Sequence, residues 1–553
     1  MPRRSELTFV VILAVAALAA CERPGGCTGP YCGTVINAAI GEPSTLLPPS
    51  SNAVVVGDIG EQLFLKLADV GMSLNTLGDE DFQPLLAQRW EWDGPLTLVF
   101  HLDPRARWHD GQTVSAADVE FTFDAYTDSA VASPFRPKLR RITSVTQRDS
   151  LTAVFRFRER YPEMFYDAVY HMRILPAHRL RSVPRDQWKT APFGRQPVGA
   201  GPYHFVRWQS AQSIELEADS TFFLGRPGIR RLIWRFTPNL QVAVTQVIAE
   251  QADIREQLVM PENVERARAA QQLTLYPFVG NVYTVLSFNL RASGDTLQPH
   301  PIFSDRDVRR ALTMAVDRAS LVKSALGDLG RVPPGPMSSL LWIWDPAIRQ
   351  LPYDTTQAKR TLSAHGWSDH DGDGVRDKDG QALAFRILVP TTSGLRRQYA
   401  RLLQEQFHKI GARVDIDELE FSVVSQRLNS GDFDTAVLSW GNDPSPSSGI
   451  NQNWSLGGFG GSNYGRYHSP DFERFADLAT AAPTRERARG FWRAAINTIN
   501  ADAPGIFLYS LENIAAVHQR IENVQIRPDS WAALLRTWRI PPDRLIDRDR
   551  VEH

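Results

Sequence analysis

The sequence predicts an α/β protein with doubly wound sheets that is divided into two or three lobes. Residues 385–440 alternate strand and helix patterns in the order β-α-β-α-β, which is typical of a sheet with helices on both faces. The chain has 553 residues, which is longer than a domain with a single hydrophobic core usually is. A hydrophobic content of 43% and an aromatic content of 10% fit large buried cores.

The charge of the chain excludes some partners. Its 61 basic and 62 acidic side chains are mixed along the sequence and give a net charge of −1. This balance offers no electrostatic basis for binding nucleic acid or an anionic membrane surface. We expect a monomer that binds neither.

The N-terminus has the pattern of an export signal. Two arginines precede an apolar run from Leu7 to Ala20, which ends in small residues. This run of about fourteen residues is shorter than the roughly twenty that span a bilayer, so a signal peptide over 1–20 is favoured over a retained anchor. The tetrapeptide Leu18-Ala19-Ala20-Cys21 resembles a bacterial lipobox, which implies cleavage before Cys21, its acylation, and a soluble protein tethered by lipid.

The other two cysteines lie in a Gly/Pro-rich tether over residues 21–33. In an exported protein Cys27 and Cys32 can be oxidised to a disulfide. Such a bridge would close a loop in the tether and not in the core. Two free thiols in a flexible tether are the alternative.

The first half of the chain predicts several elements after the tether. Residues 34–40 have a strand pattern, and residues 61–70 predict a helix with its apolar side chains on one face. Ser115 has the pattern of a helix N-cap, with Asp118 in the first turn. A strand and then a helix are predicted at 229–236 and 241–250.

The strongest helix signal begins at residue 304. Ser304 resembles an N-cap, and Asp307 completes a capping-box pattern three residues later. Apolar residues then recur at helical spacing as far as Val322 and predict one long amphipathic helix. A second helix is predicted over 352–367, with Asp354 as its N-cap.

The β-α-β-α-β region predicts the place of a binding site. Its strands are predicted at 385–389, 413–419 and 434–440, and its helices at 399–411 and 421–428. Ligands of doubly wound sheets bind beyond the carboxyl ends of strands. The residues at that end of the last strand are Trp440, Gly441, Asn442 and Asp443.

An acidic loop between these regions is spaced like a calcium-binding loop. The positions that match are Asp369, Asp371, Asp373, Val375 and Asp377. Position twelve, where such loops carry a bidentate acid, is Gly380. The loop therefore predicts a structural calcium ion, with a plain polar connection as the alternative. We expect no other cofactor.

Several motifs resemble one protein family. The segment PIFSDRDVRRALTMAVDRASLVKSALGDLGRVPPGP follows Phe288-Asn289, and W-x-DG-x-x-x-x-A-x-DV begins at Trp108. The turn around Gly-Pro-Tyr at 201–203 and the pattern from Tyr353 to Trp367 match as well. Together they resemble the family 5 extracellular solute-binding proteins of ABC importers, which include oligopeptide-, dipeptide- and nickel-binding proteins.

The resemblance implies a two-lobed periplasmic-binding-protein fold of type II, in the large cluster with an extra subdomain, whose doubly wound sheets are joined by a hinge. The chain is expected to cross between lobes near residues 278–288. The implied division is lobe I at 34–60, 190–283 and 505–545, the extra subdomain at 61–189, and lobe II at 284–504.

The resemblance also implies a ligand site. In peptide binders of the family a W-x-x-D motif provides an aspartate that binds the α-ammonium of the peptide, a role that falls to Asp443, with Trp440 as a wall of the pocket. Gly441, Asn442, Tyr283 and Trp454 complete the expected site. Residues 451–465 resemble a mobile loop over the ligand, with a plain surface loop as the alternative.

The function expected from these features is an extracytoplasmic receptor, in the periplasm or cell envelope, that delivers di- or oligopeptides to an ABC permease. An oligosaccharide, a nickel chelate or another metabolite is the alternative solute. A receptor without transport and an exported hydrolase remain further alternatives. The sequence contains no G-x-S-x-G, H-E-x-x-H or nucleotide-binding loop, so no enzyme is expected.

Overall fold

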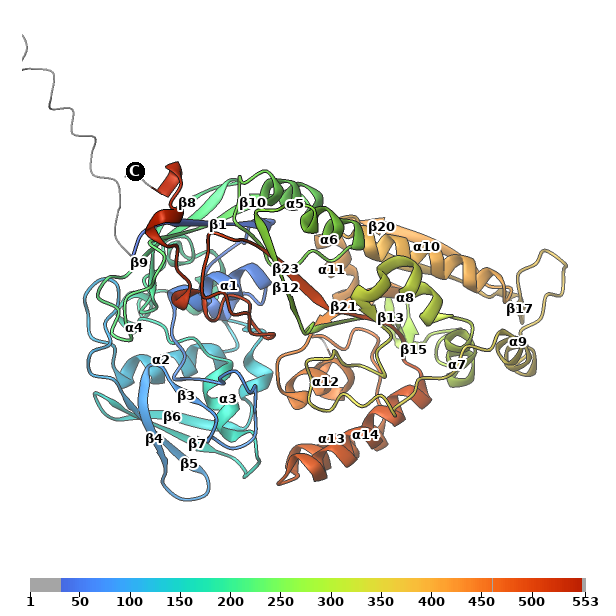
Figure 1. The fold of residues 1–553 in the computed structure, drawn as a ribbon. Helices are drawn as coiled ribbons and strands as arrows, with labels where there is room; N and C mark the ends of the chain where they lie inside the picture. The colour runs from blue at the N-terminus through green and yellow to red at the C-terminus, as the bar shows by residue number, and fades with distance from the viewer. Residues whose placement is uncertain (1–30, 460, 550–553) are drawn as a thin grey trace, which may run out of the picture.

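Figure 1 shows a computed structural model that describes residues 31–459 and 461–549. The predicted signal peptide, Cys21 and Cys27 lie outside these residues. The chain forms two bodies that lie side by side and are joined by extended segments (Figure 1). Among the helices that the structure describes, none has both the length and the apolar character needed to span a bilayer.

Lobe I is built on one sheet with both faces covered. Within the described residues its strands follow the order β12 (Leu273–Phe278), β23 (Asn513–His518), β11 (Ile254–Arg255), β1 (Thr34–Ile40), β10 (Arg231–Thr237), β9 (Ser213–Ala218) and β8 (Tyr203–Gln209). Ile36 and Ala38 of β1 pack on the side of helices α5 (Leu240–Ile248) and α6 (Pro261–Arg268). Val35 and Ala39 point to the opposite core, which contains α1 (Val54–Leu63). Alternation along β1 therefore separates two cores.

The extra subdomain is an antiparallel sheet with a helix against it. Its strands follow the order β4 (Ala87–Trp92), β5 (Thr97–Leu102), β7 (Thr152–Phe157) and β6 (Ile142–Asp149). Helix α2 (Ala116–Thr127) packs on β6 and β7. Ser115 and Asp118 form a capping box at its start, which confirms the predicted cap.

Lobe II is built on a mixed sheet. The described strands follow the order β16 (Gly330–Arg331), β22 (Gly505–Leu511), β13 (Val282–Phe288), β21 (Thr435–Gly441), β19 (Ala384–Pro390) and β20 (Arg413–Leu419). β19 lies parallel to β20 and β21, and the chain connects them through α10 (Gly394–His408) and α11 (Phe421–Ser430). The predicted β-α-β-α-β unit is confirmed, and separate hydrophobic cores lie on the two faces of the sheet.

Within residues 31–459 and 461–549, two segments cross between the lobes. One joins β12 to β13 through residues 279–281, inside the predicted interval, and the other joins β22 to β23 at Glu512. A Cβ atom on Gly280 would lie 1.5 Å from the carbonyl oxygen of Leu511, so the two crossings can approach only because residue 280 is glycine. Residues 505–511 pair with β13 and belong to the sheet of lobe II, which corrects their predicted place in lobe I.

Two helix predictions are wrong in position. Residues 64–70 are not helical, because the backbone of 65–67 bonds to residues 86, 87 and 174 on both sides. The predicted long helix after residue 304 is divided into α7 (Arg306–Met314) and α8 (Arg318–Leu326). Asp317 caps α8 by accepting a hydrogen bond from the Ser320 amide. Both helices still bury their apolar side chains in one core.

The cap of α7 is Asp305 and not the predicted Ser304. The Asp305 carboxylate accepts hydrogen bonds from the amides of Asp307 and Val308. The predicted cap Asp354 is confirmed at α9 (Thr355–Ala364), where it accepts the amide of Gln357.

The remaining described elements are short strands, helices and single turns. The strands are β2 (Ala68–Asp69), β3 (Gln83–Pro84), β14 (Arg291–Ala292), β15 (Asp295–Pro299), β17 (Asp377–Lys378) and β18 (Gln381–Ala382). The helices are α3 (Met164–Tyr170), α4 (Ala177–Leu180), α12 (Pro446–Trp454), α13 (Pro470–Ala481) and α14 (Arg485–Asp502). The 3-10 turns are η1 (Pro48–Ser50), η2 (Arg136–Leu139), η3 (Arg185–Thr190), η4 (Pro192–Gly194), η5 (Gly327–Leu329), η6 (Leu456–Gly458), η7 (Leu535–Thr537), η8 (Pro542–Arg544) and η9 (Asp547–Asp549).

Cys32 belongs to the folded body. Its side chain is 1% exposed, lies in the core of lobe I and is disulfide-bonded. The predicted tether therefore ends before Cys32, because this residue is held by packing in the core. The expectation that a bridge would lie wholly in the tether is corrected accordingly.

Candidate ligand-binding site

The carboxyl end of β21 lies at the crossing between the lobes. β21 pairs with β13 along its whole length, from Thr435 to Gly441. On its other side it pairs with β19 only at Thr435 and Ala436. The rest of β21 has no strand on that side among the described residues. The residues of this segment become more exposed toward Gly441. A Cβ atom added to Gly441 would have no other atom within 4 Å.

Asn442 holds the loop at the end of β21 in place. Its amide donates to the carbonyl of Asn281 at 2.7 Å, and its side-chain oxygen accepts the amide of Ser338 at 2.8 Å. The residue is 3% exposed. Asn442 therefore binds the end of β21 to the crossing segment 279–281, and its side-chain oxygen already accepts a hydrogen bond within the chain.

Asp443 joins lobe II to the extra subdomain. Its Oδ2 lies 2.6 Å from Nζ of Lys138 in η2, and both side chains are largely buried. Its Oδ1 accepts hydrogen bonds from the Ser448 hydroxyl and from the Ser445 amide. Burial raises the pKa of Asp443, but the Lys138 ammonium and the nearby His171 outweigh this effect and hold the pKa below its ordinary value.

Glu163 makes a second contact across the same boundary. Oε1 accepts the Thr76 hydroxyl at 2.6 Å, and Oε2 accepts the hydroxyls of Ser445 and Ser447 at 2.7 and 2.6 Å. Ser445 is the N-cap of α12, so this carboxyl group fixes the start of that helix. Burial and then the neighbouring Asp167 raise the pKa of Glu163 to about 7.

The aromatic residues of the predicted site separate into two groups. Trp440 is half-buried and stacks on Tyr464, with ring centroids 5.7 Å apart. Tyr283 is 0% exposed, and its hydroxyl accepts the indole N–H of Trp454 at 3.1 Å. Tyr283 and Trp454 belong to the core of lobe II, so the structure does not place them on a ligand-accessible surface.

Several cavities of the described chain lie along the boundary between the subdomain and lobe II, and two of them matter here. The cavity beside Asp443 measures about 70 Å³ and is lined by Lys138, Arg140, Arg141, Asp167, Ser447, Ser448, Asn451 and further neighbours. A larger cavity of about 930 Å³ is lined by subdomain residues that include Trp92 and Tyr161, and by Ala481 and Pro483 of lobe II. The lining of the smaller cavity is rich in cationic and hydroxyl groups, whereas that of the larger cavity includes aromatic rings.

The expected mobile loop is fastened to lobe II at its second half. The side-chain amide of Asn463 donates to the carbonyls of Ser455 and Tyr467. A Cβ atom on Gly465 would lie 2.4 Å from the carbonyl oxygen of Phe288. That residues 451–465 move over a ligand stays a prediction.

The acidic loop offers part of the predicted calcium site. Carboxylate oxygens of Asp369, Asp371 and Asp373 lie within 4.8 Å of one another, and all three residues are exposed. Asp377 is instead paired with the ring of His370 at 2.8 Å. Calcium binding stays a prediction.

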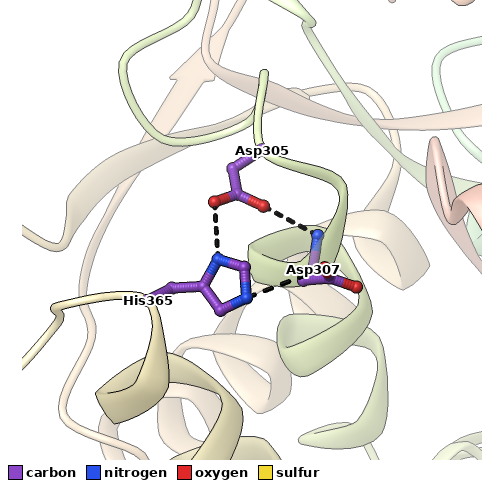
Figure 2. Close-up of side chains that lie close together, drawn as sticks. All are labelled: Asp305, Asp307 and His365. Carbon is purple, nitrogen blue, oxygen red and sulfur yellow. Dashed lines mark hydrogen bonds and ion pairs between the residues drawn. The ribbon is translucent and has the colours of Figure 1, made fainter.

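Another group of potential metal ligands lies between α7 and α9. Asp305, Asp307 and His365 point toward one another (Figure 2). Nδ1 of His365 lies 2.9 Å from Asp305, and its Nε2 lies 3.6 Å from Asp307. The contacts among the three side chains account for this arrangement, and we assign it no ligand.

Lys138 and Glu163 are the site residues that sequence reasoning missed. Lys138 lies in a run of basic residues, and Glu163 follows a proline in a turn, so neither carries a local signal of function. Their role becomes visible only when the subdomain lies against the end of β21.

Comparisons with known proteins agree with this architecture. The profile of the bacterial extracellular solute-binding proteins, family 5 (middle), matches residues 81–462. The oligopeptide-binding protein AppA of Bacillus subtilis is 27% identical over 508 residues, which cover 90% of this chain and 89% of AppA. Di/tripeptide-binding protein 2 of Pseudomonas aeruginosa is 26% identical over 385 residues, which cover 65% of this chain and 67% of that protein.

Solved structures share the fold. AppA from Bacillus subtilis in complex with a nonapeptide has a TM-score of 0.83 and 26% identity, covering 93% of this chain and 100% of that one. NikZ from Campylobacter jejuni in complex with Ni(L-His) has a TM-score of 0.79 and 23% identity, covering 92% and 99%. The two-lobed type II binding-protein fold is thereby confirmed. The chain belongs to the family 5 bacterial extracellular solute-binding proteins.

Proposed function

We propose that this protein is the receptor of an ABC importer and that it binds di- or oligopeptides between its lobes and passes them to a membrane permease. The likeness to AppA, which was solved with a nonapeptide, supports a peptide as the solute. Binding and release by hinge motion would use the two crossings beside Gly280. The protein would act outside the cytoplasm as a binding protein and not as an enzyme.

The observation that carries the peptide assignment is the free side of β21. From Val437 to Gly441 the strand lacks a neighbour on the β19 side within the described chain. An extended peptide can form backbone hydrogen bonds with such an edge, which gives affinity with little dependence on side chains. Trp440 and Tyr464 would then wall the bound peptide.

A non-peptide solute is the second candidate, because one observation favours it. Asp443, which was expected to bind the ammonium of a peptide, already pairs with Lys138. A metal chelate, a sugar or another metabolite needs no free carboxylate at this position.

We also propose that the protein is a lipoprotein and a monomer. The lipobox-like tetrapeptide before Cys21 supports the anchor. Cys32, being disulfide-bonded, supports an oxidising compartment outside the cytoplasm.

Substitution of Gly441 tests the place of the peptide. The site around Gly441 is open, so Gly441→Val should leave the melting temperature unchanged while its side chain blocks a peptide that pairs with β21. We expect calorimetric titration with a pool of peptides of two to nine residues to show at least a tenfold loss of affinity. Gly490→Val, at an equally open and exposed glycine in α14, is the control. Full affinity in the Gly441 variant would contradict the proposal.

A further inference from the structure

We propose that Lys138 occupies the place expected for the α-ammonium of a ligand, and that the receptor accordingly selects solutes that present a carboxylate at this end of the cleft. The inference rests on the proposed function, because it concerns the same cleft. Lys138 and Arg140 would then determine the specificity for solutes that carry a carboxylate.

The carboxylate of Asp443 is already satisfied within the chain. Lys138 contacts Oδ2 at 2.6 Å, while Ser445 and Ser448 donate to Oδ1. A ligand ammonium placed here would meet a like charge within a few ångströms in a largely buried site, where repulsion is weakly screened. A free amino terminus would therefore have to displace Lys138 and leave that ammonium without a partner.

The cavity next to this ion pair has the chemistry of an anion site. Lys138, Arg140 and Arg141 line it together with the hydroxyls of Ser447 and Ser448. The acid in its lining, Asp167, already accepts the Tyr161 hydroxyl at 2.7 Å and pairs with His171 at 3.4 Å.

Arg140 supplies the positive charge that remains. Lys138 pairs with Asp443 and Arg141 with Glu159 at 3.0 Å, whereas Arg140 has no acidic partner among the described residues. A Cβ atom on Gly457 of lobe II would lie 3.4 Å from Nη1 of Arg140, so the guanidinium reaches the opposite wall. A guanidinium with neighbouring hydroxyls binds a carboxylate in the planar, bidentate manner that arginine favours. A cavity of about 70 Å³ holds a group of that size.

A simpler role for Lys138 would be to hold the subdomain against lobe II through its ion pair with Asp443, without discriminating between solutes. We call this role a latch. The two roles predict different results. A latch strengthens the binding of all solutes equally, whereas a built-in ammonium disfavours free amino termini and favours acids. The preference between two forms of one peptide therefore separates them.

The test uses the full-length chain in detergent and calorimetric titration with three probes. These are tetra-alanine with a free amino terminus, the same peptide succinylated at that terminus, and succinate. We expect the succinylated peptide to bind at least tenfold more tightly than the free one. In Lys138→Met the exposed Asp443 carboxylate should reverse this preference. Arg140→Gln should weaken the binding of the succinylated peptide and of succinate, but not of the free peptide. Arg136 is an exposed residue of the same turn that does not line the cavity, so Arg136→Gln should leave the affinity for all three probes unchanged.

The outcomes distinguish this inference from the proposed function. The inference would be overturned, and peptide binding left intact, if the unaltered protein bound the free peptide more tightly than the succinylated one. The same would follow if Lys138→Met lowered the affinity for both peptides equally. Binding of succinate alone, dependent on Arg140, would support the inference and remove the peptide function. Failure of all three probes to bind would overturn both.

Discussion

The carboxyl group of Glu163 makes stability depend on pH. It lies among three hydroxyls of the subdomain and lobe II, is 4% exposed, and has a pKa of about 7 in place of the ordinary 4.5. In the unfolded chain this group loses its proton near pH 4.5, whereas in the folded protein it keeps the proton until about pH 7. The folded state therefore becomes less stable as the pH rises across this window, by roughly 3 kcal/mol at most, and changes no further above it.

A glutamine at this position should remove that dependence, because it has the shape of the protonated acid and cannot ionise. We expect the fall in melting temperature between pH 4.5 and pH 7.5 to be smaller in Glu163→Gln than in the unaltered protein. Thermal unfolding followed by circular dichroism at a series of pH values measures the difference. An identical fall in both proteins would show that Glu163 does not carry the effect.

Single residues also show where sequence reasoning ends. Trp440 and Asp443 could be located from the sequence, because they lie at the carboxyl end of a recognisable strand. The resemblance places Tyr283 and Trp454 in the ligand site, but aromatic side chains occur in cores and pockets alike, and both are in the core. Lys138 could not be found, since it precedes Asp443 by hundreds of residues and only the tertiary fold brings the two charges together.

At the scale of single elements, the start of α7 allows two candidate N-cap residues, Asp305 and Ser304, to be compared. Asp305 caps the helix and also pairs with His365 at the end of α9 (Figure 2). We expect Asp305→Ala to lower the free energy of unfolding by about 1–2 kcal/mol, the usual cost of losing a cap. Ser304→Ala should change it by less than about 0.5 kcal/mol, because Ser304 is exposed and does not cap. Denaturant titration measures both, and a larger loss in the Ser304 variant would contradict the assigned cap.

Elements with a clear period were predictable, and breaks in them were not. The β-α-β-α-β unit is right because buried parallel strands and striped helices differ strongly in apolar spacing. The stripe after residue 304 gave no sign of the break at 315–317, since both helices face one core and preserve its spacing. The apolar pattern of residues 61–70 predicts a helix throughout, but hydrogen-bond partners on two sides hold residues 65–67 in a non-helical backbone, a constraint that no local pattern encodes.

At the scale of the whole molecule, the division into lobes depends on where the chain crosses. The first crossing lies within the predicted interval, but the predicted return at residue 505 is too early, because β22 and β23 follow each other with only Glu512 between them. Such a short connection leaves no linker-like composition to read. The consequence is a narrow junction in which Gly280 and Leu511 touch, next to the end of β21 where the site lies.

The proposed function requires that a peptide bind between the two lobes. Native mass spectrometry of the full-length chain, purified in detergent without denaturant, tests it most directly. We expect a ladder of adducts that release peptides when the protein is unfolded, and the masses of these peptides would give the preferred length. A single adduct of another chemistry, released unchanged on unfolding, would contradict the peptide assignment.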